Sequence, residues 1–390
     1  MLAPTAPPPT MTASAVFGIS GMRASSSQPA ISNRAHRNDC YNMPYVTFRA
    51  VGGSAAPGRD GESDRPRIVV VDDHPPLFGS AEHPALQPLA RVAEIAVHSS
   101  RWKDREEFLS RLAGADIAVN VRAYSKFDAE SLEHAPGLRL INVVGTGVDN
   151  VDLDAATRRG VTVCNTPGVA SEAVAELALG LLFAAARGIA RSDRELREGI
   201  WAHRFNVELR GKTLGLLGLG AIGRRMAMLG SGIGMRVIAW NRTPGRAAEL
   251  GLPVEEVEFD EVFRSSDAVS LHLRSTPATA GIVGARELAL MKPAAILVNT
   301  ARAALIDLPA LAEALRAGRL AGAGLDVHQV EPLPVEQNLF RDLDSAVLTP
   351  HVGSISPDAD ERSIAATVAN ILAYLEGRPS NVVNPAGTAC

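Results

Sequence analysis

The stretch Thr213–Thr243 reads TLGLLGLGAIGRRMAMLGSGIGMRVIAWNRT, and it determines how the rest of the chain is interpreted. An apolar run leads into three glycines in G-x-G-x-x-G spacing, then a helix-like segment and a second β-rich run ending at Trp240. Strand, glycine turn, helix and strand in this order predict the βαβ unit that binds a dinucleotide, with the pyrophosphate at the helix N-terminus. The residues expected at the cofactor are Gly218, Gly220, Ala221, Ile222 and Gly223.

The end of the second run favours one nicotinamide cofactor over the other. NAD-binding units usually place a carboxylate there for the ribose hydroxyls, whereas this chain has Asn241, Arg242 and Thr243. Arg242 could pair with a 2′-phosphate, so we predict a preference for NADP with NAD as the possible alternative. Leu273 and Arg274 lie at the end of the strand-like run 268–273 and are expected near the adenosine end of the cofactor.

Composition narrows the class of protein. The 390 residues suffice for about two ordinary domains, and a hydrophobic fraction of 46% with a net charge of -4 is typical of a soluble globular protein. Neither a nucleic acid nor a membrane is expected as a partner. The three cysteines are widely spaced, so we expect no disulfide framework and no metal site, and a cytoplasmic location.

Residues 1–66 differ in composition from the rest of the chain. They are rich in Pro, Ala, Ser and Gly, have no acidic residue before Asp39, and are expected to be a disordered N-terminal extension. Arg23, Arg34 and Arg37 among serines weakly resemble a transit peptide. An upstream-extended reading frame with Met43 as the true start is an equal alternative.

From Arg67 onward, short apolar runs alternate with helical segments, which predicts right-handed βαβ crossovers and a doubly wound parallel sheet. The loops 122–125 and 145–149 come after predicted strands and are candidate walls of a substrate site. A long apolar helix is expected over 171–186, with Ser171 as its N-cap. The expected strands are 68–71, 95–97, 117–121, 140–144 and 161–164, with helices at 104–112, 129–134 and 152–159.

The same rhythm continues beyond Trp240, with strands expected at 268–273, 295–299, 322–327 and 347–351 and a helix at 360–375. Arg302, Glu331 and His351 fall at or just beyond the carboxyl ends of successive strands. That edge is where a doubly wound sheet exposes its ligand crevice. We interpret two other histidines, His272 and His328, as structural.

Several motifs resemble the D-isomer-specific 2-hydroxyacid dehydrogenase family. They are 145–153 (GTGVDNVDL), 165–168 (NTPG), 299–302 (NTAR), 325–327 with 331–332 (LDV and EP), and 349–351 (TPH). The resemblance runs from about residue 67 to 384 and implies a Rossmann nucleotide domain inserted into a flavodoxin-like substrate domain. It implies a substrate (catalytic) domain of 67–170 with 352–384, a dinucleotide-binding domain of 171–351, and a homodimer.

The resemblance also implies roles. Arg302 binds the carboxylate of a 2-oxoacid and polarises its carbonyl, His351 is the acid/base, and Glu331 hydrogen-bonds to it. These residue types suit hydride transfer, because charge left on the C2 oxygen needs a proton and a guanidinium binds a carboxylate at two points. The expected cofactor contacts are Thr146, Thr300, Ala301, Asp326 and Gly353, and the expected substrate contacts are Arg122, Ala123, Gly145 and Arg302.

Departures from the family pattern restrict the class of substrate that we expect. Phosphoglycerate-oxidising members typically carry an arginine just before the Gly-Thr-Gly-Val loop, where this chain has Val143 and Val144. We therefore expect hydride transfer between NADP(H) and a small unphosphorylated 2-oxoacid, such as glyoxylate or hydroxypyruvate, with reduction favoured. Two alternatives stay open: an NAD-dependent catabolic D-2-hydroxyacid dehydrogenase, and a non-catalytic dinucleotide-sensing interaction protein.

Overall fold

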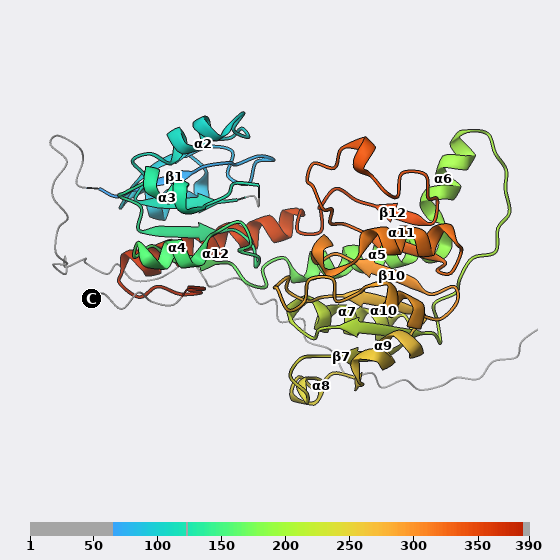
Figure 1. Ribbon diagram of the computed structural model, residues 1–390. Helices are drawn as coiled ribbons and strands as arrows, with labels where there is room; N and C mark the ends of the chain where they lie inside the picture. Colours follow the sequence, from blue (N-terminus) through green and yellow to red (C-terminus); the bar gives the residue numbers. More distant parts are fainter. Residues whose placement is uncertain (1–64, 122–123, 385–390) are drawn as a thin grey trace, which may run out of the picture. The chain divides into compact units, whose positions relative to one another are not determined.

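The computed structural model describes residues 65–121 and 124–384. Within them the chain forms two parallel β-sheets with helices on the faces of each (Figure 1). Successive strands are joined through helical crossovers, as expected for doubly wound sheets. The predicted α/β class with two doubly wound parallel sheets is confirmed.

The first sheet has five strands in the order β2-β1-β3-β4-β5. This is the flavodoxin-like order, in which the chain reverses direction across the sheet beside β1. Its central strands are buried along their whole length, because helices cover both faces. The strands are β1 (Arg67–Val70), β2 (Glu94–Val97), β3 (Ile117–Asn120), β4 (Leu140–Val143) and β5 (Thr162–Asn165).

Two separate hydrophobic clusters lie on the faces of this sheet. One contains Phe108 and Leu132, and the other contains Leu89 and Ile364. The first cluster lies under α2, α3 and α4, whereas the second lies under α1 and α12, so the last helix of the chain completes the first sheet. The helices are α1 (Gln87–Ala90), α2 (Arg105–Leu112), α3 (Ala129–His134), α4 (Leu153–Arg158) and α12 (Pro357–Leu375).

Polar contacts fasten the C-terminal segment to the same sheet. The Asn370 amide, 1% exposed, donates to Asn142 Oδ1 at 2.9 Å and to the Asn165 carbonyl at 2.8 Å. Farther along, Asn384 Oδ1 accepts from the backbone amide of Val163 at 2.8 Å. Residues far apart in sequence therefore share one set of buried hydrogen bonds.

The second sheet has seven strands in the order β12-β11-β10-β9-β6-β7-β8. From β6 the order runs outward in both directions, which is the arrangement of dinucleotide-binding sheets. The strands are β6 (Thr213–Leu217), β7 (Arg236–Trp240), β8 (Glu255–Glu256), β9 (Ala268–Leu271), β10 (Ile296–Asn299), β11 (Gly322–Leu325) and β12 (Ala346–Leu348).

Two hydrophobic clusters also fill the faces of this sheet. On one face, α5 packs so closely on β11 that a Cβ at Gly324 would lie 2.7 Å from Leu181 Cβ. The helices are α5 (Ser171–Arg187), α6 (Ile189–Arg197), α7 (Ala221–Gly232), α8 (Arg246–Glu249), α9 (Phe259–Ser265), α10 (Ala285–Leu290) and α11 (Leu308–Arg316). Short 3-10 turns occur at Pro84–Leu86, Ala303–Leu305 and Val335–Gln337.

Some sequence expectations need correction. Ser171 is the first residue of α5 rather than its N-cap, which is Ala170 and makes no side-chain cap. The last helix begins at Pro357, three residues before the expected start, because the Ser356 side chain caps it by accepting from the Ala359 amide. The predicted extension 1–66 and the start at Met43 fall almost entirely outside the described residues.

No single helix among residues 65–121 and 124–384 is both long and apolar enough to cross a membrane. The pair α5 and α6 passes a test of length and composition when taken together, but the two helices meet at a 61° bend.

Candidate active site

The glycine turn lies between β6 and α7, as predicted. Gly218 has φ +99°, a conformation that favours glycine, and a Cβ at Gly223 would lie 2.0 Å from the Gly218 carbonyl oxygen. Gly220 is the N-cap of α7 and supplies no side-chain acceptor for the first amides of the helix. These amides fit the pyrophosphate of a dinucleotide.

The end of β7 carries no carboxylate. Asn241 Oδ1 accepts from the Leu219 amide of the glycine turn at 3.2 Å, and its Nδ2 donates to the Thr243 carbonyl at 2.8 Å. Asn241 thus fixes the loop against the turn, while the exposed Arg242 guanidinium has no hydrogen bond or ion pair with any described residue.

The end of β9 lies on the other side of the glycine turn. A Cβ at Gly218 would lie 3.0 Å from Leu273 Cδ2 and 2.8 Å from the His272 carbonyl oxygen. Burial lowers the pKa of His272 to about 4, so the imidazole is neutral at neutral pH. Its Nε2 pairs with Ser270 Oγ at 3.0 Å, consistent with the structural interpretation, and Arg274 is exposed.

A side-chain amide shapes the turn after β10. Asn299 Oδ1 accepts from the Ala301 amide at 2.9 Å, and its Nδ2 donates to the Arg302 carbonyl at 2.8 Å. Thr300 is 7% exposed, and its Oγ1 is buried without a protein partner among the described residues. An unsatisfied buried hydroxyl is costly, so Thr300 fits a residue that hydrogen-bonds a bound ligand.

Asp326, at the end of β11, fixes the loop that carries His351. Its Oδ1 accepts from Thr349 Oγ1 at 2.6 Å and from the Val352 amide at 2.9 Å, and its Oδ2 accepts from the Gly353 amide at 2.9 Å. These bonds span His351, which has φ +54°, a conformation that costs a non-glycine residue energy. Asp326 therefore holds the loop, a role that adds to the cofactor contact predicted for it.

His351 and Glu331 form the central pair of the site. His351 Nδ1 and Glu331 Oε2 are 2.7 Å apart, and the His328 amide donates to Glu331 Oε1 at 3.0 Å. Burial by itself raises the pKa of Glu331, but the hydrogen bonds from His351 and from the His328 amide outweigh it and place the pKa below its usual value. The carboxylate is therefore ionised at neutral pH and fixes the imidazole in one orientation.

The pair opens onto a cavity of about 360 Å³. His328 also lines it, and its Nε2 contacts the Thr349 carbonyl at 2.9 Å, which gives this residue a second structural contact. The remaining lining residues are Pro332, Leu333, Asn338, Leu348, Thr349 and Pro350.

The loop after β4 forms part of the predicted substrate wall. The Gly145 amide donates to Thr166 Oγ1 at 2.6 Å, and the Thr146 carbonyl accepts from Asn165 Nδ2 at 2.8 Å. Arg302 reaches this loop, where its Nε donates to Asp149 Oδ2 at 2.8 Å. The two other predicted substrate contacts, Arg122 and Ala123, lie outside the described residues.

The three predicted catalytic residues are not all in contact. No hydrogen bond or ion pair joins Arg302 to Glu331 or His351 within the described ranges. Sequence reasoning assigned no role to the Asn299 side chain, and it placed Asp149 in a candidate substrate wall without relating it to Arg302. An asparagine at the end of a strand was the available signal for Asn299, because its side chain readily forms such turns.

No group of three or more His, Cys, Asp or Glu residues is placed to hold a metal ion in the part of the chain that the structure describes. The buried Thr300 hydroxyl and the close approach at Gly223 instead fit an organic ligand with a pyrophosphate group.

Comparison with known proteins identifies the family. Residues 179–353 match the model of the D-isomer specific 2-hydroxyacid dehydrogenase, NAD binding domain. A glyoxylate reductase of Thermococcus litoralis is 41% identical over 73% of this chain and 89% of its own. The chain belongs to the D-isomer specific 2-hydroxyacid dehydrogenase family. The resemblance inferred from the motifs is confirmed, and a nicotinamide dinucleotide is the cofactor class of the enzyme.

Other members of this dehydrogenase family match as well. A hydroxypyruvate reductase of Thermotoga maritima is 40% identical over 71% of this chain and 90% of its own. A D-3-phosphoglycerate dehydrogenase of Mycobacterium leprae is 43% identical over 67% of this chain but 50% of its own. Among solved structures, an acyclic imino acid reductase (Bsp5) in complex with NADPH and D-Arg has a TM-score of 0.71 and 30% identity, covering 81% of this chain and 99% of its own.

Proposed function

We propose that this protein reduces a small unphosphorylated 2-oxoacid to the D-2-hydroxy acid, with NADPH preferred as the hydride donor. The observation that carries the proposal is the His351–Glu331 pair, with 2.7 Å between Nδ1 and Oε2. The two residues lie in the loops after β12 and β11, which belong to the same sheet as the glycine turn. A carboxylate-oriented imidazole is the group that a carbonyl reduction needs, because the C2 oxygen gains a proton as the carbon gains a hydride.

Different residues of the chain have different roles in the proposed reduction. The bound cofactor supplies the hydride, and the Arg302 guanidinium binds the carboxylate of the substrate and orients it. Because Nδ1 of His351 is held by Glu331, its Nε2 is left to donate the proton to the C2 oxygen. We assign the cofactor to the glycine turn, to 241–243, to Leu273 and Arg274, and to Thr146, Thr300, Ala301, Asp326 and Gly353, and the substrate to Gly145, Arg302 and the loop 122–123.

The domain division belongs to the same proposal. We assign 67–170 with 352–384 to the substrate domain and 171–351 to the dinucleotide-binding domain. Two observations support it: α12 packs on the five-stranded sheet, and α5 packs on the seven-stranded one. A cytoplasmic location remains our prediction.

The preference for NADPH is supported by the loop after β7. Asn241 stands where a carboxylate would repel a 2′-phosphate, and the Arg242 guanidinium is exposed and unpaired among the described residues. Arg274 is a second exposed cation, one residue after Leu273, which lies against the glycine turn. A phosphate between such groups forms charge-assisted hydrogen bonds.

The substrate class is supported by the sequence before the Gly145 loop and by two relatives. Val143 is 4% exposed within β4, so this position supplies no cation for a phosphate. The relatives named glyoxylate reductase and hydroxypyruvate reductase are 41% and 40% identical.

A panel of 2-oxoacids against both cofactors tests the function. We expect oxidation of NADPH with glyoxylate or hydroxypyruvate, and a rate at least tenfold lower with NADH. Faster turnover of 3-phosphohydroxypyruvate than of any unphosphorylated 2-oxoacid would overturn the proposed substrate class. No turnover with any 2-oxoacid, together with tight NADPH binding, would favour the dinucleotide-sensing alternative.

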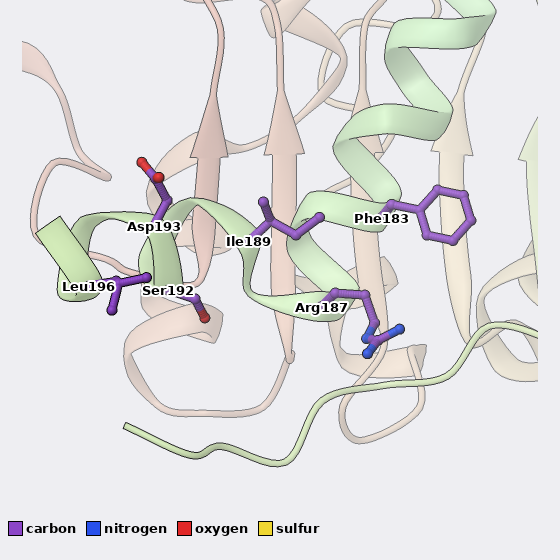
Figure 2. A pocket seen from close by; sticks show the side chains of 6 residues that line it. All are labelled: Phe183, Arg187, Ile189, Ser192, Asp193 and Leu196. Carbon is purple, nitrogen blue, oxygen red and sulfur yellow. The ribbon is translucent and has the colours of Figure 1, made fainter. Parts of the chain in front are cut away.

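We further propose a homodimer formed through α6 and the segment after it. Five large apolar side chains are exposed there: Ile189, Leu196, Ile200, Trp201 and Phe205, with Trp201 at 79%. Beside them, the end of α5 and α6 line a cavity of about 600 Å³ (Figure 2). Exposed apolar patches of this kind mark protein interfaces, and a second copy related by two-fold symmetry buries each patch against the other.

Light scattering on a sizing column tests the dimer. We expect the wild type at twice the chain mass, and the double variant Trp201→Ser with Phe205→Ser at the mass of one chain. Met228→Ser, which changes an exposed apolar residue on α7, is the matched control and keeps the dimer. A monomeric wild type would contradict the proposal.

A further inference from the structure

The loop after β4 holds the guanidinium to which we assign the substrate carboxylate. The geometry points to Asp149 as a positioning residue that, with Gly147, fixes which edge of Arg302 faces the 2-oxoacid. The inference rests on the proposed function, since it concerns how the same arginine grips its substrate.

Two acceptors fix the guanidinium. Arg302 Nε donates to Asp149 Oδ2 at 2.8 Å, and Nη1 donates to the Ala301 carbonyl at 2.8 Å. Asp149 comes from the loop after β4, whereas Ala301 is the residue before the arginine itself. Arg302 and Asp149 retain side-chain exposures of 34% and 53%, so a solute can still reach the pair.

The loop that presents Asp149 is itself anchored on both sides. Asn150 Nδ2 donates to the Ser125 carbonyl at 2.6 Å, and Asn165 Nδ2 donates to the Thr146 carbonyl at 2.8 Å. The Val151 amide closes a turn onto the Val148 carbonyl at 3.0 Å. Asp149 is therefore held on a fixed support rather than on a free loop.

Gly147 completes the set of groups that hold the guanidinium. We call this set the arginine seat, and it consists of Asp149, the Ala301 carbonyl and Gly147. A Cβ at this position would lie 1.9 Å from Arg302 Nη2 and 3.1 Å from Cζ. The backbone of Gly147 is not in the left-handed region, so its conformation does not require glycine. The requirement comes from the guanidinium, which a side chain here would displace.

These contacts determine which edge of the Arg302 guanidinium is left for the substrate. A guanidinium has five N–H donors, of which Nε carries one and each terminal nitrogen carries two. Asp149 occupies Nε and Gly147 lies against Nη2, so the edge that joins Nε and Nη2 faces the loop. The terminal edge, Nη1 and Nη2, retains donors for a two-point grip on the carboxylate of the 2-oxoacid.

Loss of Asp149 should affect binding more than chemistry. Without this carboxylate, the arginine loses the partner that limits its rotamers, and ordering it on binding costs conformational entropy. Substrate binding should weaken, while the saturated reaction changes little, because His351 and Glu331 do not contact Asp149.

Three variants test the seat, with a fourth as control. Asp149→Ala removes the acceptor, Asp149→Asn keeps an acceptor oxygen without the charge, and Gly147→Ala displaces the guanidinium. Asp154→Ala changes an exposed carboxylate near the start of α4 and is the matched control. The readouts are KM and kcat for glyoxylate, the Kd of oxamate for the enzyme–cofactor complex, the Kd of NADPH, and the melting temperature.

For Asp149→Ala and Gly147→Ala we expect KM for glyoxylate and Kd for oxamate to rise about tenfold or more. We expect kcat and the Kd of NADPH to stay within about threefold, and Asp149→Asn to recover most of the loss. Unchanged KM in both variants would overturn the proposal. So would a fall in melting temperature with equal weakening of NADPH and oxamate, because that indicates a merely structural role.

The failure of the seat and the failure of the function are distinguishable. A wild type that reduces glyoxylate while Asp149→Ala retains its KM refutes the seat alone. A wild type that neither reduces 2-oxoacids nor binds oxamate refutes the proposed function, and the seat falls with it.

Discussion

The loop after β12 carries His351, the loop after β7 carries Arg242, and the two are held differently. The first is fixed by three hydrogen bonds to Asp326, and His351 is already paired with Glu331. The second is fixed at Asn241, but the Arg242 guanidinium is exposed and has no partner among residues 65–121 and 124–384. The group assigned to proton transfer is pre-arranged, whereas the group assigned to cofactor choice depends on the ligand to order it.

The largest expected effect comes from removing the pre-arranged group. His351→Ala should lower kcat for glyoxylate reduction by about 10²–10⁴, which is the contribution of general acid catalysis. NADPH binding, measured by fluorescence, should stay within about twofold. Activity within a few-fold of the wild type would show that the imidazole does not supply the proton.

Next comes the residue that holds the loop. Asp326→Ala removes all three acceptor bonds, so His351 should relax from its positive φ and kcat should fall about 10²-fold, as expected for a misplacement of about 1 Å. Asp326→Asn keeps one acceptor oxygen and should lose less. If both variants keep wild-type kcat with a lower melting temperature, the loop does not need this clamp for chemistry.

A change in the loop after β7 should have a smaller effect, and one that is confined to NADPH. Arg242→Ala should raise KM for NADPH about tenfold, the loss expected for one charge-assisted hydrogen bond, and leave KM for NADH unchanged. Arg158→Ala, an exposed arginine on α4, is the matched control. Equal losses with both cofactors would contradict a contact with the 2′-phosphate.

The smallest effect on kcat is expected at Glu331, the partner of the imidazole. The pKa of Glu331 is lowered from its ordinary value of 4.5. The ionised carboxylate therefore stabilises the folded protein fully above pH 4.5, and this stabilisation is lost as the pH falls through the folded-state pKa. Near pH 6, Glu331→Gln should lower kcat about threefold. Because the Glu331 carboxylate protonates as the pH falls below 4.5, the difference in kcat between wild type and variant should shrink there. A kcat equal to that of the wild type near pH 6 would separate Glu331 from the proton donor.

Much of the scaffold was predictable because it depends on local sequence. The glycine spacing and the apolar runs located β6, α7 and β7 in the right order, since period and turn chemistry act over short distances. By contrast, α6 was not predicted, because its sequence holds only two large apolar residues, Ile189 and Leu196, and both are exposed. It is supported instead by ion pairs such as Arg191–Glu195 and Arg197–Asp193 along the helix.

The parts of the site that escaped prediction depend on contacts between distant residues. Asp149 and Arg302 are 153 positions apart, so no spacing in the sequence relates them. The opposite holds for His351 and Glu331, which lie at the ends of neighbouring elements and were predictable from strand order together with family motifs.

The buried amide of Asn370 has a consequence for how the molecule is made. Residues 67–165 leave the ribosome well before α12 is translated, yet their sheet is hydrogen-bonded to Asn370 and Asn384 and one of its hydrophobic faces is covered by α12. The seven-stranded sheet, by contrast, has all its strands by residue 348. The part of the protein synthesised first is therefore the last to be completed, and a nascent chain halted before residue 357 would expose an uncovered apolar face to chaperones.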